Sequence, residues 1–182
     1  KAIYTIEKFL SSRRIMYLQV YLHKTAMVAE KMLKQLLQQI SSQYENEISN
    51  YEIKELLQNK NSKQEQLDRN RFLELFSSLD DADIWSLLKH CKNHSNDLVS
   101  NLAVGLLDRI LYKIDIKTEQ NEKSMLQPHP ILGQTFKVDF TAYDPAEGEI
   151  MIKRKNGAIT ALSEFNEFNY LMQNISRYYT IK

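Results

Sequence analysis

The first 104 residues contain neither glycine nor proline, and this absence constrains the fold more than any other feature of the chain. Proline breaks helix interiors and glycine weakens them, so a long stretch without either residue favours helices. All four glycines and all three prolines come after residue 104. We therefore expect a helix-rich body, followed by a part of the chain in which turns and strands are common.

The helical pattern begins almost at the first residue. We expect a long helix from about Tyr4 to Ile40, with a break near Ser11 and Ser12, because serine side chains compete for backbone hydrogen bonds. The polar segment 41–66 is expected to be a connection with one short helix in it. Shorter helices are expected over residues 51–58 and 68–77. A further helix is expected to start after a cap at Asp80 or Asp81, and another to run from Asn96 or Asp97 to about Arg109.

The period of the hydrophobic pattern changes near residue 111. Alternating apolar residues in LYKIDI (111–116) and FKVDFTAY (136–143) predict strands. Segment 149–162 predicts a β-hairpin around Asn156 and Gly157, which are the strongest signal for a two-residue type I′ turn.

A last helix is expected to start at Ser163 and to hold apolar residues as far as Ile175. The predicted fold class is therefore α+β and predominantly α. Residues 1–116 would form the helical body, and residues 117–182 would form a small antiparallel sheet with a C-terminal helix.

Charge and cysteine content exclude several classes of protein. The 24 Lys and Arg residues nearly balance the 23 Asp and Glu residues, whereas general binding to nucleic acid or to a membrane surface usually needs a strong basic bias. The single cysteine, Cys91, rules out an internal disulfide and fits a reducing cytoplasm. No apolar run approaches the roughly 20 residues of a membrane helix. We expect a cytoplasmic protein with no membrane or specific nucleic-acid partner.

Four residues of the long helix form a polar stripe: Arg13, Tyr17, Tyr21 and Lys24. Their spacing of i, i+4, i+8 and i+11 puts them on one face of a regular helix. A nucleotide would suit this stripe, with phosphates for the cations and a ring or sugar for the phenols. From the residues alone, a solvated edge with carboxylate partners ranks ahead, because exposed Arg and Lys are common. Apolar neighbours predict that the helix is packed on its other sides: Phe9, Met16, Val20, Met27 and Leu33.

The sequence around this stripe resembles a segment of the HD-domain phosphohydrolases, in the branch that contains the deoxynucleoside triphosphate triphosphohydrolases. The core of the match is RRIMYLQVYLHKT (13–25). Two further segments fit in order and spacing, LDDADIWSLLK (79–89) and LLDRILYKI (106–114). The resemblance covers residues 1 to about 116 and extends more weakly to the end. It implies that the helix around residues 13–25 lines a nucleotide pocket.

The resemblance also implies roles for the four stripe residues. Arg13 is similar to a family arginine that contacts the substrate phosphates, and Tyr21 to a tyrosine beside the nucleoside. Tyr17 stands where the best-known nucleotide-cleaving members have a histidine. Lys24 follows His23 as in the family, where this pair lies near the nucleotide.

The His-Asp pair that names the family is absent from the chain. None of its four histidines, His23, His90, His94 and His129, is followed by Asp. In the family the metal ligands precede this helix, and the chain starts without Met inside a helical pattern. We expect the C-terminal part of a longer enzyme, with no catalytic residue and no metal ligand in this chain. The intact enzyme would bind a divalent metal and hydrolyse a nucleotide, and homo-oligomerisation follows by family analogy only.

Other residue groups have ordinary structural interpretations. His90, Cys91 and His94 form an HCxxH pattern, but one helix supplies two useful ligands where zinc needs three or four, so a helix C-terminus is the better interpretation. Helix capping explains the cluster of acids that begins at Asp80, and Trp85 is expected to anchor the core. The other residues considered for metal or phosphate contact are Asp81, Asp83, Arg109, Tyr112 and Lys113.

Two other functions stay open at this point. A non-catalytic helical interaction or scaffold domain would leave the stripe facing solvent or paired with local carboxylates. A protein that binds single-stranded nucleic acid would use the same aromatic and basic residues, but the neutral charge balance disfavours it.

Overall fold

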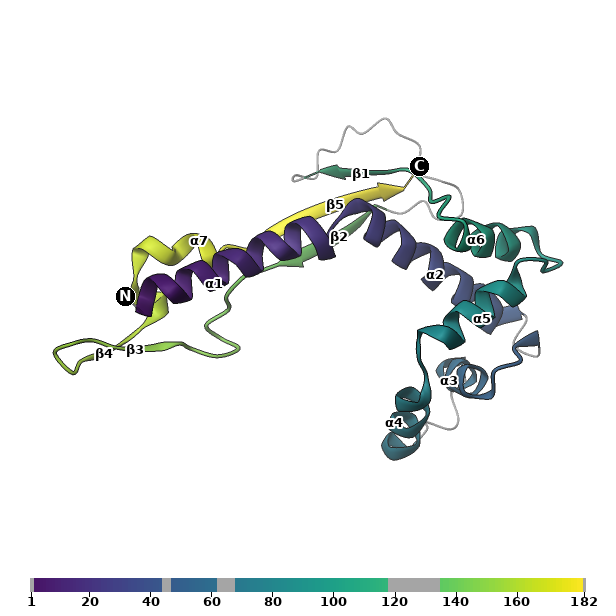
Figure 1. Ribbon diagram of the computed structural model, residues 1–182, viewed down its shortest axis with the longest axis horizontal. Coiled ribbons are helices and arrows are strands. Elements are labelled where there is room, and N and C mark those ends of the chain that lie inside the picture. The colour runs from purple at the N-terminus through teal and green to yellow at the C-terminus, as the bar shows by residue number, and fades with distance from the viewer. Residues whose placement is uncertain (1, 44–46, 62–67, 118–134, 182) are drawn as a thin grey trace. The chain divides into compact units, whose positions relative to one another are not determined.

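The computed structural model describes residues 2–43, 47–61, 68–117 and 135–181 (Figure 1). The chain forms two compact units, one made of residues 1–27 and 114–182 and the other of residues 28–113. The first unit thus joins the start of the chain to its end. The change of sequence pattern suggests a division into domains 1–116 and 117–182, and this division stays a prediction. The α+β class with a predominance of helix is confirmed.

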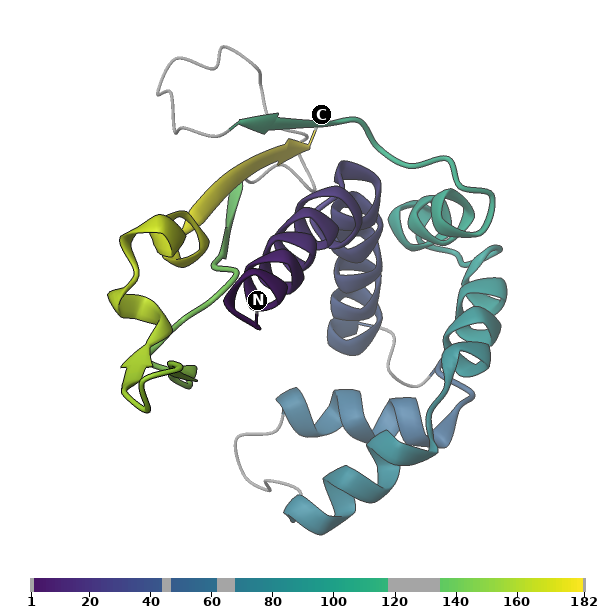
Figure 2. The same cartoon turned by 60° about the vertical axis from the view of Figure 1, so that its left-hand side comes forward.

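The first unit is built on a three-stranded antiparallel sheet in the order β1-β5-β2. The outer strands are β1 (Ile114–Lys117) and β2 (Phe136–Phe140), and the central strand is β5 (Ile175–Ile181). Helix α1 (Ala2–Met16) and the π turn η1 (Tyr17–Tyr21) belong to the same unit. Figure 1 shows α1 beside α7, with the C-terminal end of α1 near β2 and β5, and Figure 2 shows the same helix from a second direction.

The central strand of this sheet is a correction to the predicted last helix. After two short 3₁₀ turns, η3 (Leu162–Glu164) and η4 (Asn166–Phe168), the helix α7 covers only Asn169–Met172. The chain then enters β5, whose sequence ISRYYTI is rich in the β-branched and aromatic residues that favour strands. Tyr179 and Ile181 alternate into the core and are fully buried. The expectation of a helix as far as Ile175 was therefore wrong.

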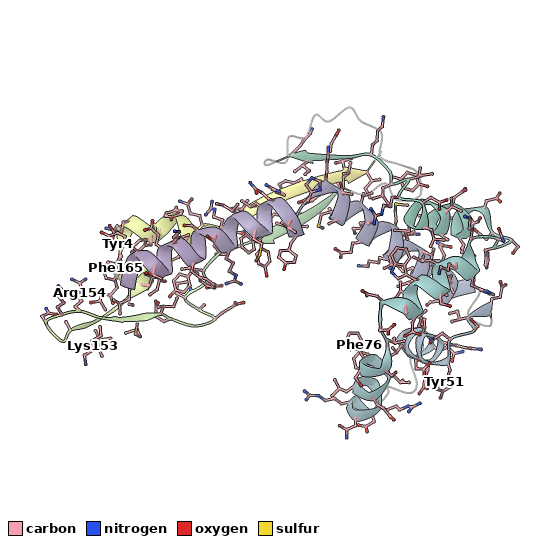
Figure 3. All side chains as sticks on the ribbon, viewed as in Figure 1. Tyr4, Tyr51, Phe76, Lys153, Arg154 and Phe165 are labelled. Carbon is pink, nitrogen blue, oxygen red and sulfur yellow. The ribbon has the colours of Figure 1, made fainter. Side chains whose placement is uncertain are left out.

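The predicted β-hairpin is present, as a separate two-stranded sheet of β3 (Met151–Lys153) and β4 (Ile159–Ala161). Its turn is not of type I′, which needs positive φ at both central residues. Only Gly157 in this turn has positive φ, at 84°, and its N–H donates to Arg154 O at 3.0 Å. This pattern is a three-residue loop with glycine in the left-handed position. Arg154 also lies over the ring of Phe165, 5.0 Å from its centroid (Figure 3).

A hydrogen-bonded carboxylate joins this hairpin to the loop after β2. The buried Tyr143 hydroxyl donates to Glu149, and the Ser163 hydroxyl donates to the other carboxylate oxygen at 2.7 Å. The Tyr143 hydroxyl oxygen also accepts the N–H of Ile150 at 3.0 Å. The hydrogen bonds from Tyr143 and then Ser163 lower the pKa of Glu149, because they favour its charged form.

We expect Glu149 to make the first unit sensitive to acid. A carboxyl whose folded pKa is lowered stabilises the fold above its ordinary pKa of about 4.3, and this contribution disappears as pH falls through the lowered value. The free energy of unfolding in urea should therefore be measured at pH 7 and at a pH below 4. The difference between the two values should be smaller for Glu149→Gln than for the parent chain. Glu147→Gln, at an exposed carboxylate two residues earlier, should keep the parent's difference. An unchanged difference in Glu149→Gln would contradict the expectation.

The second unit is helical and is built around the greater part of α2 (Lys24–Gln43). One face of α2 is fully or almost fully buried and consists of Val28, Met32, Leu36 and Ile40. The remaining helices are α3 (Tyr51–Asn61), α4 (Arg69–Ser78), α5 (Asp81–Cys91) and α6 (Asp97–Leu107). Among the described residues, no helix has the length and apolar character to cross a membrane.

Two of the predicted helix starts in this unit, at Asp80 and Asn96, are confirmed by side-chain caps. The Asp80 side chain accepts the N–H groups of Ala82 and Asp83, and the Asp83 side chain accepts the N–H of Asp80, which makes a capping box. Asn96 caps α6 by accepting the N–H groups of Leu98 and Val99. Capping thus accounts for the acidic cluster at residues 80–83.

Two predictions about burial were wrong within this chain. Trp85 is not a core anchor, because 46% of its surface is exposed. Three of the five apolar residues expected to pack the first helix are also exposed, namely Phe9, Met16 and Val20, whereas Met27 is buried. Helical spacing shows which residues share a face of the helix, but it does not show whether other parts of the chain bury that face.

Candidate functional site

The long helix is broken at residues 17–23 rather than near Ser11 and Ser12, which stay inside α1. The Leu22 N–H donates to Tyr17 O at 2.8 Å, an i→i+5 hydrogen bond. In an α-helix the same N–H would donate to Leu18 O. The π turn therefore leaves the Leu18 carbonyl without its usual partner. Single π turns inside α-helices often occur at functional sites.

Two residues of β5 bond to the carbonyls of this break. The Arg177 guanidinium donates through Nη1 to Leu18 O at 2.8 Å and to Leu22 O at 3.3 Å. The buried Tyr179 hydroxyl donates to Leu22 O at 2.7 Å. The carbonyls that the break releases from helical hydrogen bonds are thus bonded to side chains of the central strand.

Three of the four stripe residues lie in contact with one another. The Arg13 guanidinium carbon is 5.6 Å from the ring centroid of Tyr17, and the rings of Tyr17 and Tyr21 are 4.9 Å apart at 42°. The Arg13 Nη1 also donates to Ala142 O at 3.1 Å. The structure therefore places one cation and two phenols in a continuous row along the end of α1 and the π turn.

The two tyrosines differ in what they offer to a ligand. Phe140 of β2 stacks on the Tyr17 ring with centroids 4.3 Å apart and planes at 13°, so one face of that half-buried ring is covered. Tyr21 is 55% exposed. A base or sugar would therefore find its contact on Tyr21, while Tyr17 holds Arg13 and Tyr21 on either side of it.

Lys24 stands apart from this row. It is the first residue of α2, after the break, and its side chain is exposed. Within the described part of the chain, its ammonium group has no ion pair. The spacing that placed Lys24 on the stripe assumed an unbroken helix, and the π turn removes that assumption.

The HCxxH pattern has a structural role in the second unit. The His94 side chain is 5% exposed, and its Nδ1 accepts the N–H of Asn96 at 3.0 Å. This hydrogen bond assigns the proton to Nε2, which lies 3.0 Å from the carboxylate of Glu47. Burial, and to a lesser degree Glu47, raises the pKa of the Cys91 thiol to about 11, which keeps it protonated and unreactive. His90 is exposed in the last turn of α5.

A metal centre finds no ligand set in the described part of the chain. There, no three His, Cys, Asp or Glu side chains come close enough to hold a metal ion. The described residues therefore do not fit the divalent metal that the family resemblance implies.

The residues that support the row from the sheet were not predicted from the sequence. Phe140 lay in a predicted strand, but nothing local linked it to Tyr17. Arg177 and Tyr179 lay beyond the predicted last helix, in a segment to which no element was assigned. The signal that was available for them is the β-branched and aromatic run ISRYYTI.

Comparison with known proteins gives a likeness of fold. No protein-family model matches the chain, and no curated protein matches it. Among solved structures, a phosphohydrolase from Bacteroides thetaiotaomicron VPI-5482 matches all of this chain over 50% of its own length, with 27% identity and a TM-score of 0.74. The chain shares the fold of this phosphohydrolase.

A second solved structure shows the fold alone. It is a hypothetical protein from Aquifex aeolicus, 20% identical, with a TM-score of 0.59 over 98% of this chain and 42% of that one. The chain thus spans half the length of the first of these proteins and less than half of the second.

Proposed function

We propose that this chain is the C-terminal part of a metal-dependent HD-superfamily phosphohydrolase and forms one wall of its nucleotide pocket. The observation that carries the proposal is the row Arg13–Tyr17–Tyr21, a guanidinium next to two phenol rings on a helix that ends in a π turn. The likeness of fold to a phosphohydrolase over the whole chain supports it. The resemblance of residues 13–25 to the deoxynucleoside triphosphate triphosphohydrolases points to that substrate class.

Each residue of the wall has a role that its surroundings allow. Arg13 binds the substrate phosphates, because only one of its guanidinium nitrogens donates to Ala142 O and the remaining N–H groups suit phosphate oxygens. Tyr21 packs on the sugar or base through its exposed ring, and Tyr17 spaces Arg13 from Tyr21. Lys24 adds a compact positive charge that attracts phosphate.

The proposed reaction consumes one water and cleaves the bond between the sugar oxygen and the α-phosphorus. A deoxynucleoside and triphosphate are the two products. The divalent metal that activates water in such chemistry has no ligand set among the described residues, so we assign it to the rest of the polypeptide. Homo-oligomerisation and a cytoplasmic location belong to the same proposal by family analogy.

The direct test is hydrolysis of dGTP by the full-length protein with Mg²⁺ or Mn²⁺. We expect deoxyguanosine and triphosphate as products, separated by ion-exchange chromatography, and no turnover after chelation with EDTA. A matched reaction with GTP measures the preference for the deoxy sugar. Full-length protein that releases neither product with either metal would contradict the proposal.

The alternative function is a non-catalytic helical interaction or scaffold domain. The observation that favours it is the number of exposed large apolar side chains on helices of both units: Phe9, Ile15, Met16, Val20, Phe72, Leu73, Phe76 and Trp85. Such side chains often mark protein interfaces. Substrate hydrolysis by the full-length protein distinguishes the two functions.

A further inference from the structure

We propose that Arg177 and Tyr179 are positioning residues of the nucleotide site, acting through the π turn that carries Tyr17 and Tyr21. This inference rests on the proposed function, since it assigns residues to the same pocket. Neither residue is in the row itself. Both lie on β5, more than 150 residues along the chain from the carbonyls to which they donate.

The first step of the argument is the exchange of hydrogen bonds at the break. Since the Leu22 N–H donates to Tyr17 O, the helix has no N–H left for Leu18 O. A part-buried carbonyl without a donor is unfavourable, so a π turn at this place needs an outside donor. Arg177 supplies that donor at 2.8 Å.

The second step is the charge and shape of the donor. The Arg177 Nη1 bonds Leu18 O and also reaches Leu22 O at 3.3 Å. A planar guanidinium can hold two carbonyls in a fixed relation, which a lysine ammonium on a flexible stem does less well. Arg177 therefore fixes the distance between the two ends of the turn.

The third step is the rigidity of Tyr179. Its ring is fully buried and stacks on Phe136 with centroids 5.2 Å apart and planes at 13°. Phe136 and Tyr179 are paired in the register of β2 and β5. The hydroxyl that donates to Leu22 O is thus held by the core of the sheet, and residues 177 and 179 share one face of their strand.

The consequence concerns the angle between the two tyrosines. A turn with i→i+5 hydrogen bonds winds through fewer degrees per residue than a turn with i→i+4 bonds, so it changes the offset of Tyr21 from Tyr17. Without the donors from β5, an ordinary α-helical turn regains its advantage because Leu22 N–H and Leu18 O can pair again. The offset between the Tyr17 and Tyr21 rings, 4.9 Å apart at 42° in this structure, would then change.

The experiment measures kcat and KM for dGTP in the full-length protein carrying Tyr179→Phe or Arg177→Met. Tyr179→Phe removes one hydroxyl and keeps the buried ring, so it is the mild variant. Tyr178→Phe is the matched control, because Tyr178 is the neighbour whose side chain lies on the other face of β5. We expect KM to rise about threefold in both variants with a smaller change in kcat, and to stay at the parent value in the control.

The division between KM and kcat separates positioning from stability. A variant that is only less well folded loses active molecules, which lowers the apparent kcat and leaves KM unchanged. Amide hydrogen exchange over residues 17–23 adds a readout that does not depend on nucleotide, and it should change in both variants.

Parent protein that hydrolyses dGTP, together with variants of unchanged KM, would overturn the inference and leave the proposed function intact. Parent protein without hydrolysis would overturn both. If Arg177→Met does not fold, the result for Tyr179→Phe decides.

Discussion

Replacing Arg13 with alanine in the full-length protein is expected to lower kcat/KM for deoxynucleoside triphosphate hydrolysis at least about tenfold, equivalent to about 1.4 kcal/mol of transition-state stabilisation. The reason is electrostatic: Arg13 is the cation of the row Arg13–Tyr17–Tyr21, and no ion pair with a described carboxylate neutralises it. A charge-assisted hydrogen bond to phosphate is among the stronger polar contacts that a protein makes. Steady-state kinetics over a range of substrate concentrations measures the effect.

Arg14→Ala is the matched control for this prediction. Arg14 is the next residue of α1 and loses the same charge, but its guanidinium lies over Tyr170 of α7, away from the row. We expect near-parental kcat/KM for Arg14→Ala. Equal losses in the two variants would show that net charge or stability, rather than phosphate contact, explains the effect. Arg13→Lys should recover part of the activity, because it restores the charge without the planar guanidinium.

The hydrogen bond from Arg13 to Ala142 O gives this residue a second, structural role. Its loss is expected to lower stability by about 1 kcal/mol. Urea unfolding of the same variant measures that contribution. Kinetics measured at a temperature at which the variant is fully folded are not affected by the loss of stability. Unchanged turnover in Arg13→Ala would remove Arg13 from the site and favour the scaffold function.

Local signals predicted those elements of the fold whose causes lie within a few residues. Asp80 and Asn96 cap helices because their side chains reach N–H groups two and three residues away. The hairpin around Gly157 was predicted for the same reason, although the turn type was not. Asn156 has negative φ in the turn that forms, so only one of the two signal residues takes the left-handed conformation.

Only those residues of the candidate site that are close to one another along the first helix and its π turn could be placed together from the sequence. Arg13, Tyr17 and Tyr21 lie within eight residues of one another, and the structure brings them together. Lys24 lies beyond a break whose partners are on β5. No local pattern around residue 20 could show that Arg177 would bond Leu18 O, because that contact spans 159 residues. The role of each residue in binding nucleotide stays a prediction.

Gly105 is a further case in which the cause lies far along the chain. In the sequence this glycine only marks the end of a glycine-free stretch, yet it lies inside α6 and is buried. A Cβ atom at this position would lie 2.7 Å from Cε of the buried Met32 and 3.0 Å from Ile110 O. The chain turns back after α6 through Arg109, whose φ is 58°, and this turn brings the Ile110 carbonyl close to Gly105. The close approach of the Ile110 carbonyl, rather than backbone flexibility, therefore favours glycine here.

Gly105→Val is expected to destabilise the second unit by about 1–3 kcal/mol, the usual range for overpacking a core. Valine gains only a few tenths of a kcal/mol in helix propensity over glycine, which is too little to offset a contact with a backbone carbonyl. Gly105→Ala should lose less, because it adds one carbon and gains about 1 kcal/mol in propensity. Asn101→Val, at an exposed position of the same helix, should change stability by less than about 0.5 kcal/mol. Urea unfolding followed by circular dichroism at 222 nm, the usual helix signal, measures all three, and parental stability in Gly105→Val would show that α6 and the turn at Arg109 can move apart at no cost.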